Sequence, residues 1–313
     1  MEFLYLLEKI RIPVMNEFML LITQLGEETA FLVIALILFW CVDKYKGYFV
    51  LCVGFVGTLM NQVLKLIFRI PRPWVLDEKF KILEQAREAA TGYSFPSGHT
   101  QSAVGTFGSI AYVSRKRSVR IIGVVIAGLV AFSRMYVGVH TPLDVFVSIA
   151  IALLLIVILK HFVLDNFSRS FPYVIIFMFA LAIGALLFVE LYSFPADIDA
   201  ENLYSGKKNV FTLFGSLSGM LIVYIVDEKW LKFKTKAVWW AQIIKVVAGL
   251  GIILLVKTGL KPLLDTLLGE QFGLYGELIG RTVRYMIVVI TAGILWPLSF
   301  RFFNKIGKRT LRN

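Results

Sequence analysis

The chain has 313 residues, of which 58% are hydrophobic and only 17% are charged, and its formal net charge is +12. Soluble domains contain about 25% charged residues, so this composition excludes an ordinary soluble globular protein and indicates an integral membrane protein. The excess positive charge suits anionic lipid head groups. We therefore expect the lipid bilayer as a partner and do not expect nucleic acid.

The first 26 residues have the pattern of an amphipathic helix. Apolar residues such as Phe3 and Leu7 recur at helical spacing, and charged residues such as Glu8 and Arg11 lie between them. We predict that residues 1–26 form an interfacial helix at the membrane surface. A cleaved signal peptide is not expected, because acidic residues interrupt the apolar stretch and no basic segment precedes it.

Apolar stretches that can cross a bilayer, which takes about 20 residues, recur from this segment to the end of the chain. We predict membrane-spanning helices at residues 28–43, 47–68, 98–114, 119–135, 142–163, 173–193, 209–227, 237–257 and 283–303. The predicted fold is therefore all-α, a polytopic membrane helical bundle of about nine transmembrane helices.

The end of the second predicted span carries three cations, Lys65, Arg69 and Arg72. Long cationic side chains at a helix end commonly reach back to the lipid head groups, and this explanation is sufficient for Arg69. Arg72 differs because it lies between Pro71 and Pro73, which restrict its backbone. We expect the Arg72 guanidinium to be held where it can make a bidentate contact with a phosphate.

The third predicted span begins with Ser97, Gly98 and His99, which follow Pro96. Exposed N–H groups and the helix dipole favour an anion at such a helix start. Ser97 can add a hydroxyl donor, and Gly98 lacks the Cβ that would block close approach. Alone, this sequence also fits ordinary helix capping, so its significance depends on the neighbouring motifs.

His140 and Asp144 repeat the arrangement at the start of the fifth predicted span. Thr141 is a candidate N-cap and Pro142 a favoured first helical residue, which puts Asp144 in the first turn. The Asp144 carboxylate can then hold one ring nitrogen of His140 and present the other as a nucleophile or a base. Alternatively, His140 is an interfacial loop residue and Asp144 only complements the helix dipole.

Arg134, which ends the fourth span beside Ser133, would complete a clamp of three cations around an anion.

The distribution of Lys and Arg predicts the orientation of the chain in the membrane. Basic residues gather in alternate connections, which we expect to face the cytoplasm: Lys44, Lys46, Arg115, Lys116, Arg117, Arg120, Lys160, Arg169, Lys229, Lys232, Lys234, Lys236, Arg301, Lys305, Lys308, Arg309 and Arg312. The motif-bearing connections lie on the opposite side. We expect a multi-pass protein of the plasma membrane whose active site faces out of the cytoplasm.

Together, the motifs resemble the signature of the type 2 phosphatidic acid phosphatase (PAP2) superfamily. The matching positions are Lys65-x6-Arg72-Pro73, Pro96-Ser97-Gly98-His99 and Ser133-Arg134-x5-His140-x3-Asp144. The family includes membrane lipid phosphatases, glucose-6-phosphatase-like enzymes and vanadium-dependent haloperoxidases. The resemblance, over residues 20–163, implies a PAP2-like catalytic core of five spans at residues 27–165.

The resemblance implies catalytic roles for three residues. His140 would form a phosphohistidine, Asp144 would orient His140, and His99 would protonate the leaving oxygen and later activate water. The resemblance also implies that the phosphoryl oxygens are bound by Lys65, Arg72, Ser97, Gly98 and Arg134. The family needs no metal, and we expect neither a metal nor another cofactor.

The implied function is a metal-independent membrane phosphatase for lipid phosphate or diphosphate monoesters. Candidate substrates are undecaprenyl diphosphate, phosphatidylglycerol phosphate, phosphatidic acid and sphingoid phosphates. A phosphotransferase with the same intermediate and a glucose-6-phosphatase-like enzyme for a soluble ester remain alternatives. A transporter or scaffold without chemistry is a further alternative, favoured only by the ionisable Lys245 inside the eighth span. The simpler explanation of an ionisable residue at this position is that the long Lys245 side chain reaches to the membrane interface.

Residues 166–313 form a predicted four-span extension beyond the usual six-span core of the family, and they carry no comparable motif. The sequence leaves open whether this extension shapes substrate access, mediates oligomerisation or only packs, and it does not predict an oligomeric state. Gly215 and Gly219 form a GxxxG pair, which allows close approach of two helices. We expect this pair to serve packing within the monomer rather than dimerisation.

Overall fold

The computed structural model describes residues 1–303, and every regular element in that range is a helix. This confirms the predicted all-α class. The basic residues expected after the last span, Lys305, Lys308, Arg309 and Arg312, lie outside the described residues.

The chain divides into two compact units, which are described separately below. The first unit contains residues 1–34, 49–161 and 193–206, and the second contains residues 35–48, 162–192 and the described residues from 207 onward. The helices up to residue 136 are α1 (Glu2–Lys9), α2 (Pro13–Gln24), α3 (Glu28–Ile37), η1 (Leu38–Val42), α4 (Lys44–Phe68), α5 (Pro73–Leu76), η2 (Glu84–Ala86), α6 (Gly98–Ala103), η3 (Val104–Gly108), α7 (Ser109–Val113) and α8 (Arg117–Tyr136). The later helices are α9 (Pro142–Lys160), η4 (His161–Asp165), α10 (Phe167–Leu191), α11 (Ala200–Val226), η5 (Asp227–Leu231), α12 (Trp239–Phe272), α13 (Leu274–Ile290), η6 (Thr291–Leu295) and α14 (Trp296–Leu298).

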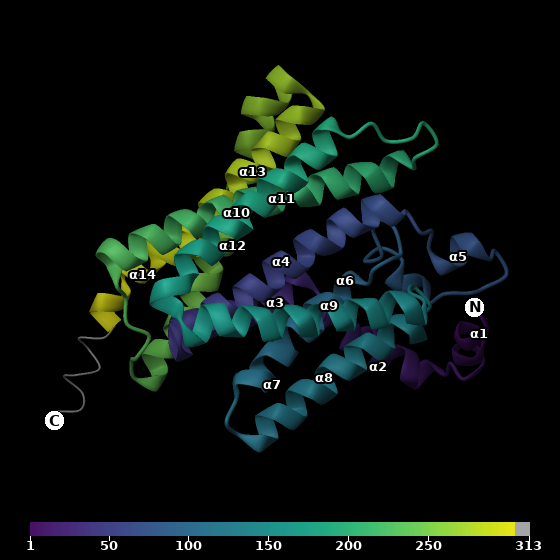
Figure 1. The fold of residues 1–313 in the computed structure, drawn as a ribbon, viewed down its shortest axis with the longest axis horizontal. Helices are drawn as coiled ribbons and strands as arrows, with labels where there is room; N and C mark the ends of the chain where they lie inside the picture. The colour runs from purple at the N-terminus through teal and green to yellow at the C-terminus, as the bar shows by residue number, and fades with distance from the viewer. Residues whose placement is uncertain (304–313) are drawn as a thin grey trace. The chain divides into compact units, whose positions relative to one another are not determined.

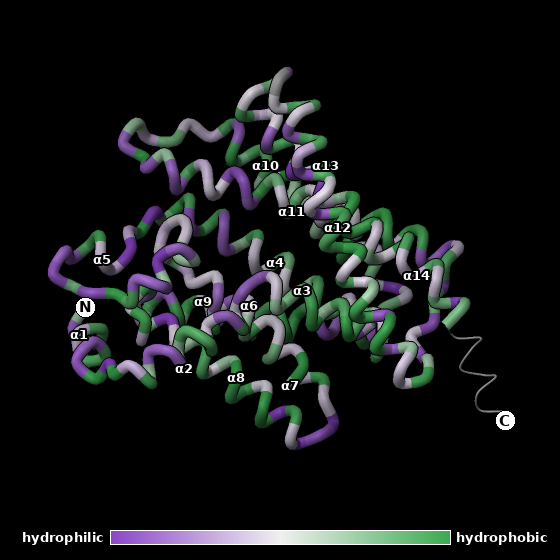
Figure 2. The backbone as a smooth tube through the Cα atoms, turned by 180° about the vertical axis from the view of Figure 1, so that it is seen from behind, coloured by the Kyte–Doolittle hydropathy of each residue, from purple (hydrophilic) through white to green (hydrophobic). Residues whose placement is uncertain are grey.

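The described residues include 7 helices that are long and apolar enough to cross a membrane. The helices Pro13–Gln24 and Glu28–Val42, which are bent by 53° relative to each other, make an eighth if they are counted as one span. The predicted span at 98–114 is helical from Gly98 to Val113, as α6, η3 and α7 in succession. This run is shorter than the 7 helices counted above. Figure 2 shows mostly apolar residues along α8 and hydrophilic residues in the α7–α8 connection, as expected for a spanning helix and its polar turn. The multi-span architecture is confirmed.

The N-terminal amphipathic segment forms two helices rather than one. Pro13 lies at the first position of α2 and ends the helical run of α1 before it. Leu4 and Leu7 of α1 pack in a cluster with Phe80 and Met135, so this face of α1 is covered by protein. Other apolar side chains of the segment are exposed in the structure and are available to lipid.

The long helix α8 organises the first unit, because α1, α2, α6, η3, α7 and α9 all pack against it. Small residues permit the close approach: a Cβ on Gly123 would lie 2.8 Å from the carbonyl oxygen of Phe107. As Figure 1 shows, α4 and α8 end, and α6 and α9 begin, at the same end of this unit. The motif-bearing connections 69–97 and 137–141 therefore meet at that end.

Lys245 in the second unit directs its ammonium back to the connection that precedes α12. Its side chain is buried, its Nζ donates to the carbonyl oxygen of Thr235 at 3.1 Å, and it lies 4.3 Å from the centroid of the Phe300 ring. A backbone carbonyl and an aromatic face thus satisfy the ammonium inside the unit. These contacts are compatible with the reach towards the helix end that was predicted as the simpler explanation of this residue.

The GxxxG pair packs two helices of the second unit together, in agreement with the expectation from sequence. A Cβ on Gly215 would collide with the carbonyl oxygen of Thr282, and one on Gly219 would lie 2.8 Å from that of Met286. Both contacts join α11 to α13. Glycine is required at these positions because the two backbones approach closely.

We expect Gly215→Val to destabilise the protein by about 1–3 kcal/mol, because the added side chain overfills this contact. Gly251→Val is the matched control, since Gly251 on α12 has no atom within 4 Å of its Cβ position. The melting temperature in detergent should fall for the first variant and stay close to that of the wild type for the second. Equal melting temperatures for the two variants would contradict the close α11–α13 packing.

Candidate functional site

The first turn of α9 is built around Asp144. Thr141 is the N-cap: its hydroxyl accepts from the N–H of Asp144, and the Asp144 carboxylate accepts from the N–H of Thr141 at 2.8 Å. Pro142 occupies the start of the helix. The capping arrangement predicted from the sequence is confirmed, and it fixes the direction of the carboxylate.

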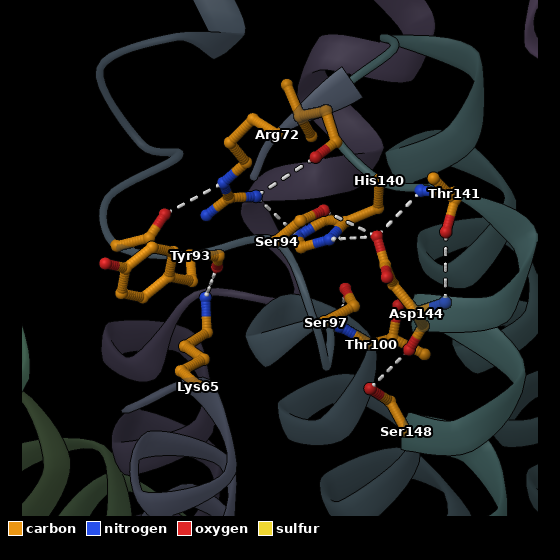
Figure 3. Close-up of polar contacts among 12 residues, drawn as sticks. Lys65, Arg72, Tyr93, Ser94, Ser97, Thr100, His140, Thr141, Asp144 and Ser148 are labelled. Carbon is orange, nitrogen blue, oxygen red and sulfur yellow. Dashed lines mark hydrogen bonds and ion pairs between the residues drawn. The ribbon is translucent and has the colours of Figure 1, made fainter. Parts of the chain in front are cut away.

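The Asp144 carboxylate holds the imidazole of His140. Its Oδ2 lies 3.3 Å from His140 Nδ1 and accepts from the Ser94 hydroxyl at 2.6 Å (Figure 3). His140 and Asp144 are both about 1% exposed. With Nδ1 carrying the proton that faces the carboxylate, Nε2 of His140 presents its lone pair on the opposite side of the ring. Ser94 was not predicted, because only the folded chain brings it to Asp144.

The Arg72 guanidinium is held in place by three backbone carbonyl oxygens. Nε donates to Gly92 at 3.0 Å, Nη2 donates to Thr91 at 2.8 Å, and Nη1 donates to Val139 at 3.0 Å. Nη1 also lies 3.0 Å from Nε2 of His140. Backbone carbonyls therefore restrain the guanidinium, and it donates to Nε2 of His140 (Figure 3).

Electrostatics keep His140 neutral. Burial lowers the pKa of His140 well below its usual range, since charged imidazolium is poorly solvated there. The positive charges of Arg72, Arg134 and Lys65 lower this pKa further. A neutral imidazole with one nitrogen oriented by a carboxylate can act as a nucleophile.

Ser97 and His99 lie where α6 begins. Ser97 is the N-cap, and its hydroxyl accepts from the N–H of Thr100, which is the capping arrangement that the sequence offered as an alternative to anion binding. The N–H of Ser97 donates to the carbonyl oxygen of Asp144 at 3.2 Å, which ties the second motif to the third. Nε2 of His99 is buried and has no hydrogen-bond partner among the described residues. His99 lies within electrostatic range of His140 and Arg134.

Arg134 is fully buried at the end of α8. Its Nη1 donates to the hydroxyl of Thr23 at 2.6 Å, while Nε and Nη2 have no hydrogen-bond partner within residues 1–303. Thr23 belongs to α2, and no pattern in the sequence linked it to the motif. The two unpartnered nitrogens leave donors that an anion can use.

Lys65 completes the set of cations. Its Nζ donates to the carbonyl oxygen of Tyr93, and it lies within electrostatic range of Arg72, Arg134 and Asp144. The structure thus brings together all the residues predicted for the site: Lys65, Arg72, Ser97, Gly98, His99, Arg134, His140 and Asp144. These residues include three buried cations and one buried carboxylate, so the net positive charge of the site attracts an anion. No group of three His, Cys, Asp or Glu side chains in the described part of the chain could hold a metal ion.

A cavity of about 770 Å³ opens beside Arg72. Its walls come from the end of α4, the connection after it and the segment that leads into α11; they include Phe68, Arg69, Trp74, Tyr93, Asp197 and Ile198. Arg69 was left out of the predicted site as an interfacial residue, but the structure places it on the wall of this cavity. The cavity gives a ligand access to the guanidinium of Arg72.

Comparison with known proteins agrees with this geometry. Residues 45–168 match the PAP2 superfamily, and residues 211–309 match the PAP2 superfamily phosphatase, transmembrane extension. Phosphatidylglycerophosphatase B of Bacillus subtilis (strain 168) is 33% identical over 166 residues, which cover 49% of this chain and 77% of that protein. No solved structure matches the chain.

Two further relatives have other substrates in their names. Undecaprenyl-diphosphatase BcrC of Bacillus subtilis (strain 168) is 34% identical over 102 residues, which cover 33% of this chain and 50% of that protein. Sphingosine-1-phosphate phosphatase 1 of Rattus norvegicus is 26% identical over 315 residues, which cover 90% of this chain and 70% of that protein. On these matches, and with every signature position gathered at one site, the chain belongs to the PAP2 superfamily and is a phosphoric ester hydrolase of the membrane.

Proposed function

We propose that the protein hydrolyses lipid phosphate or diphosphate monoesters through a phosphohistidine on His140. The observation that carries this proposal is the contact between a neutral, carboxylate-oriented imidazole and a restrained cation: His140 Nε2 lies 3.0 Å from Nη1 of Arg72. A phosphoryl group bound by Arg72 would have its phosphorus next to the nucleophilic nitrogen. Such positioning and charge stabilisation supply most of the catalysis in phosphoryl transfer.

In the first step, Nε2 of His140 attacks phosphorus and the bond from phosphorus to the leaving oxygen breaks. Nη1 of Arg72 moves from the imidazole lone pair to a phosphoryl oxygen as the substrate binds. His99 gives a proton to the leaving oxygen, which departs as an alcohol or, from a diphosphate, as a monophosphate. Lys65, Ser97, Gly98 and Arg134 bind the phosphoryl oxygens.

In the second step, water attacks the phosphohistidine, and the bond between phosphorus and Nε2 breaks. His99 takes a proton from the water, and inorganic phosphate leaves with the His140 imidazole restored. Asp144 holds Nδ1 throughout, so the imidazole returns to the same tautomer.

A lipid substrate suits the surroundings of the site. The wall of the cavity beside Arg72 combines charged residues such as Asp197 with apolar side chains, of which Phe68 and Val75 are more than half exposed in the structure. An acyl or prenyl tail can stay in the bilayer while its phosphate enters the cavity. The relatives named above all carry lipid phosphates in their names. The candidates are undecaprenyl diphosphate, phosphatidylglycerol phosphate, phosphatidic acid and a sphingoid phosphate.

We place the active site on the extracytoplasmic face of the plasma membrane. The basic α7–α8 connection, with Arg115, Lys116 and Arg117, lies at the end of α8 opposite Arg134. Since basic connections remain in the cytoplasm, this distribution supports a site that faces outward.

We expect His140→Ala to reduce phosphate release by at least about 10³-fold, because no other residue can form the covalent intermediate. His99→Ala should reduce it by about 10²–10⁴-fold. His161→Ala is the control, since His161 lies at the far end of α9 and is exposed. Phosphate release by the purified variants and protein-bound radiolabel after an alkaline quench are the measurements. Near-normal activity of His140→Ala would refute the mechanism.

The pH dependence of kcat/KM tests the electrostatics. The pKa of His140 is lowered, so the imidazole stays neutral, and active, as the pH falls below 6.5, its usual pKa. Arg72→Gln removes one positive charge, so the pKa of His140 should rise and the acid limb of kcat/KM should move up by about one pH unit. Both proteins are assayed with the same substrate, so the ionisation of the substrate contributes equally to the two pH profiles. Identical acid limbs would contradict this assignment.

A substrate panel separates the remaining possibilities. We expect kcat/KM to fall about tenfold or more when a long-chain substrate is replaced by its short-chain analogue, because tail contacts are lost. The panel contains undecaprenyl diphosphate, phosphatidylglycerol phosphate, phosphatidic acid, sphingosine-1-phosphate and glucose-6-phosphate. Equal cleavage of long-chain and tail-free substrates would point to an enzyme for soluble esters. Transfer of a radiolabelled phosphoryl group to an added alcohol, in place of its release as inorganic phosphate, would point to a phosphotransferase.

A further inference from the structure

Asn61 is a buried polar residue of the first unit that the mechanism above does not use. It lies on α4, one helical turn before Lys65, so the two side chains share a face of that helix. Asn61 is 2% exposed, and neither Oδ1 nor Nδ2 has a hydrogen-bond partner in the part of the chain that the structure describes. Buried amides are nearly always hydrogen-bonded, so this side chain calls for an explanation.

The Asn61 amide borders the Ser97–His99 turn. A Cβ built on Gly98 would meet one atom within 4 Å, Oδ1 of Asn61, at 3.7 Å. On the next turn of α4, Lys65 lies within electrostatic range of Arg72 and Asp144. Asn61 therefore lies at the edge of the proposed phosphate site, on α4 and one helical turn before Lys65.

Gln101 provides an internal comparison. It is also buried, and its Nε2 likewise lacks a partner within the described residues. However, the Gln101 amide lies against Gly57, one turn of α4 further from Lys65 than Asn61. Two similar amides thus lie between α4 and α6, and only that of Asn61 lies next to Gly98.

We propose that Asn61 is a further phosphate-binding residue, whose Nδ2 donates to a phosphoryl oxygen held at Gly98. This inference rests on the proposed function. Rotation of the amide turns Nδ2 towards the turn that Oδ1 now faces, and the two groups differ so little in shape that the site accommodates either. A neutral donor adds a hydrogen bond without adding a fourth charge to the three cations of the site.

The test combines turnover with binding of orthovanadate, which mimics the phosphoryl group in transfer. We expect Asn61→Leu, which keeps the branched shape of the side chain and removes the donor, to lower kcat/KM by about 100-fold. The vanadate concentration that gives half-maximal inhibition should rise by a similar factor. Asn61→Ala should show the same losses, and it replaces Asn61→Leu if that variant does not fold. Gln101→Leu is the matched control and should change both values by less than about threefold.

Unchanged vanadate affinity in a folded Asn61 variant would overturn the inference. Losses of equal size in Gln101→Leu would also overturn it, because they would show that the effect comes from packing between α4 and α6. A second readout, the rise in melting temperature on addition of vanadate, does not require turnover. If the wild type releases phosphate from no lipid, the proposed function fails, and this second readout still decides whether Asn61 binds the anion.

Discussion

Buried positive charge is the constraint on which the arrangement of the first unit depends. Lys65, Arg72 and Arg134 are all removed from solvent, and Asp144 is the one buried carboxylate among the motif residues. Removal of an ion from water costs several kcal/mol, even after the protein relaxes around it. The chain offsets this cost with backbone oxygens, three of which surround the guanidinium of Arg72. The connections at 69–97 and 137–141 must therefore fold back on the helix ends, and this folding forms the site.

In the proposed mechanism, the charges that bind the phosphate also prepare the nucleophile. They disfavour the imidazolium form of His140, and Arg72 donates to the nitrogen that would attack phosphorus. Ser94 and the N–H of Thr141 both donate to the Asp144 carboxylate, so it holds a fixed direction. In this way, phosphate binding and nucleophile activation depend on one set of contacts. Removal of a single cation would change both.

The features that could be predicted from the sequence are those determined by short stretches of chain. The caps at Ser97 and Thr141 depend on residues within one helical turn, and the spans depend on runs of apolar residues. The partners of the motif residues depend on packing between distant segments, so Thr23 and Ser94 gave no signal. The partners of the Lys245 ammonium gave no signal for the same reason, because Thr235 and Phe300 lie on other segments of the second unit.

The connection between α10 and α11 shows why the motifs alone do not select a substrate. Residues 193–206 pack with the first unit, although they lie between the two matched regions, 45–168 and 211–309. They contribute Asp197 and Ile198 to the cavity wall, and Arg72 is the one signature residue among the residues that line the same cavity. In the proposed function, the signature residues bind the phosphate, which every candidate substrate shares. The groups that meet the rest of the head group come from segments outside the signature, so selectivity among lipid phosphates must depend on those segments.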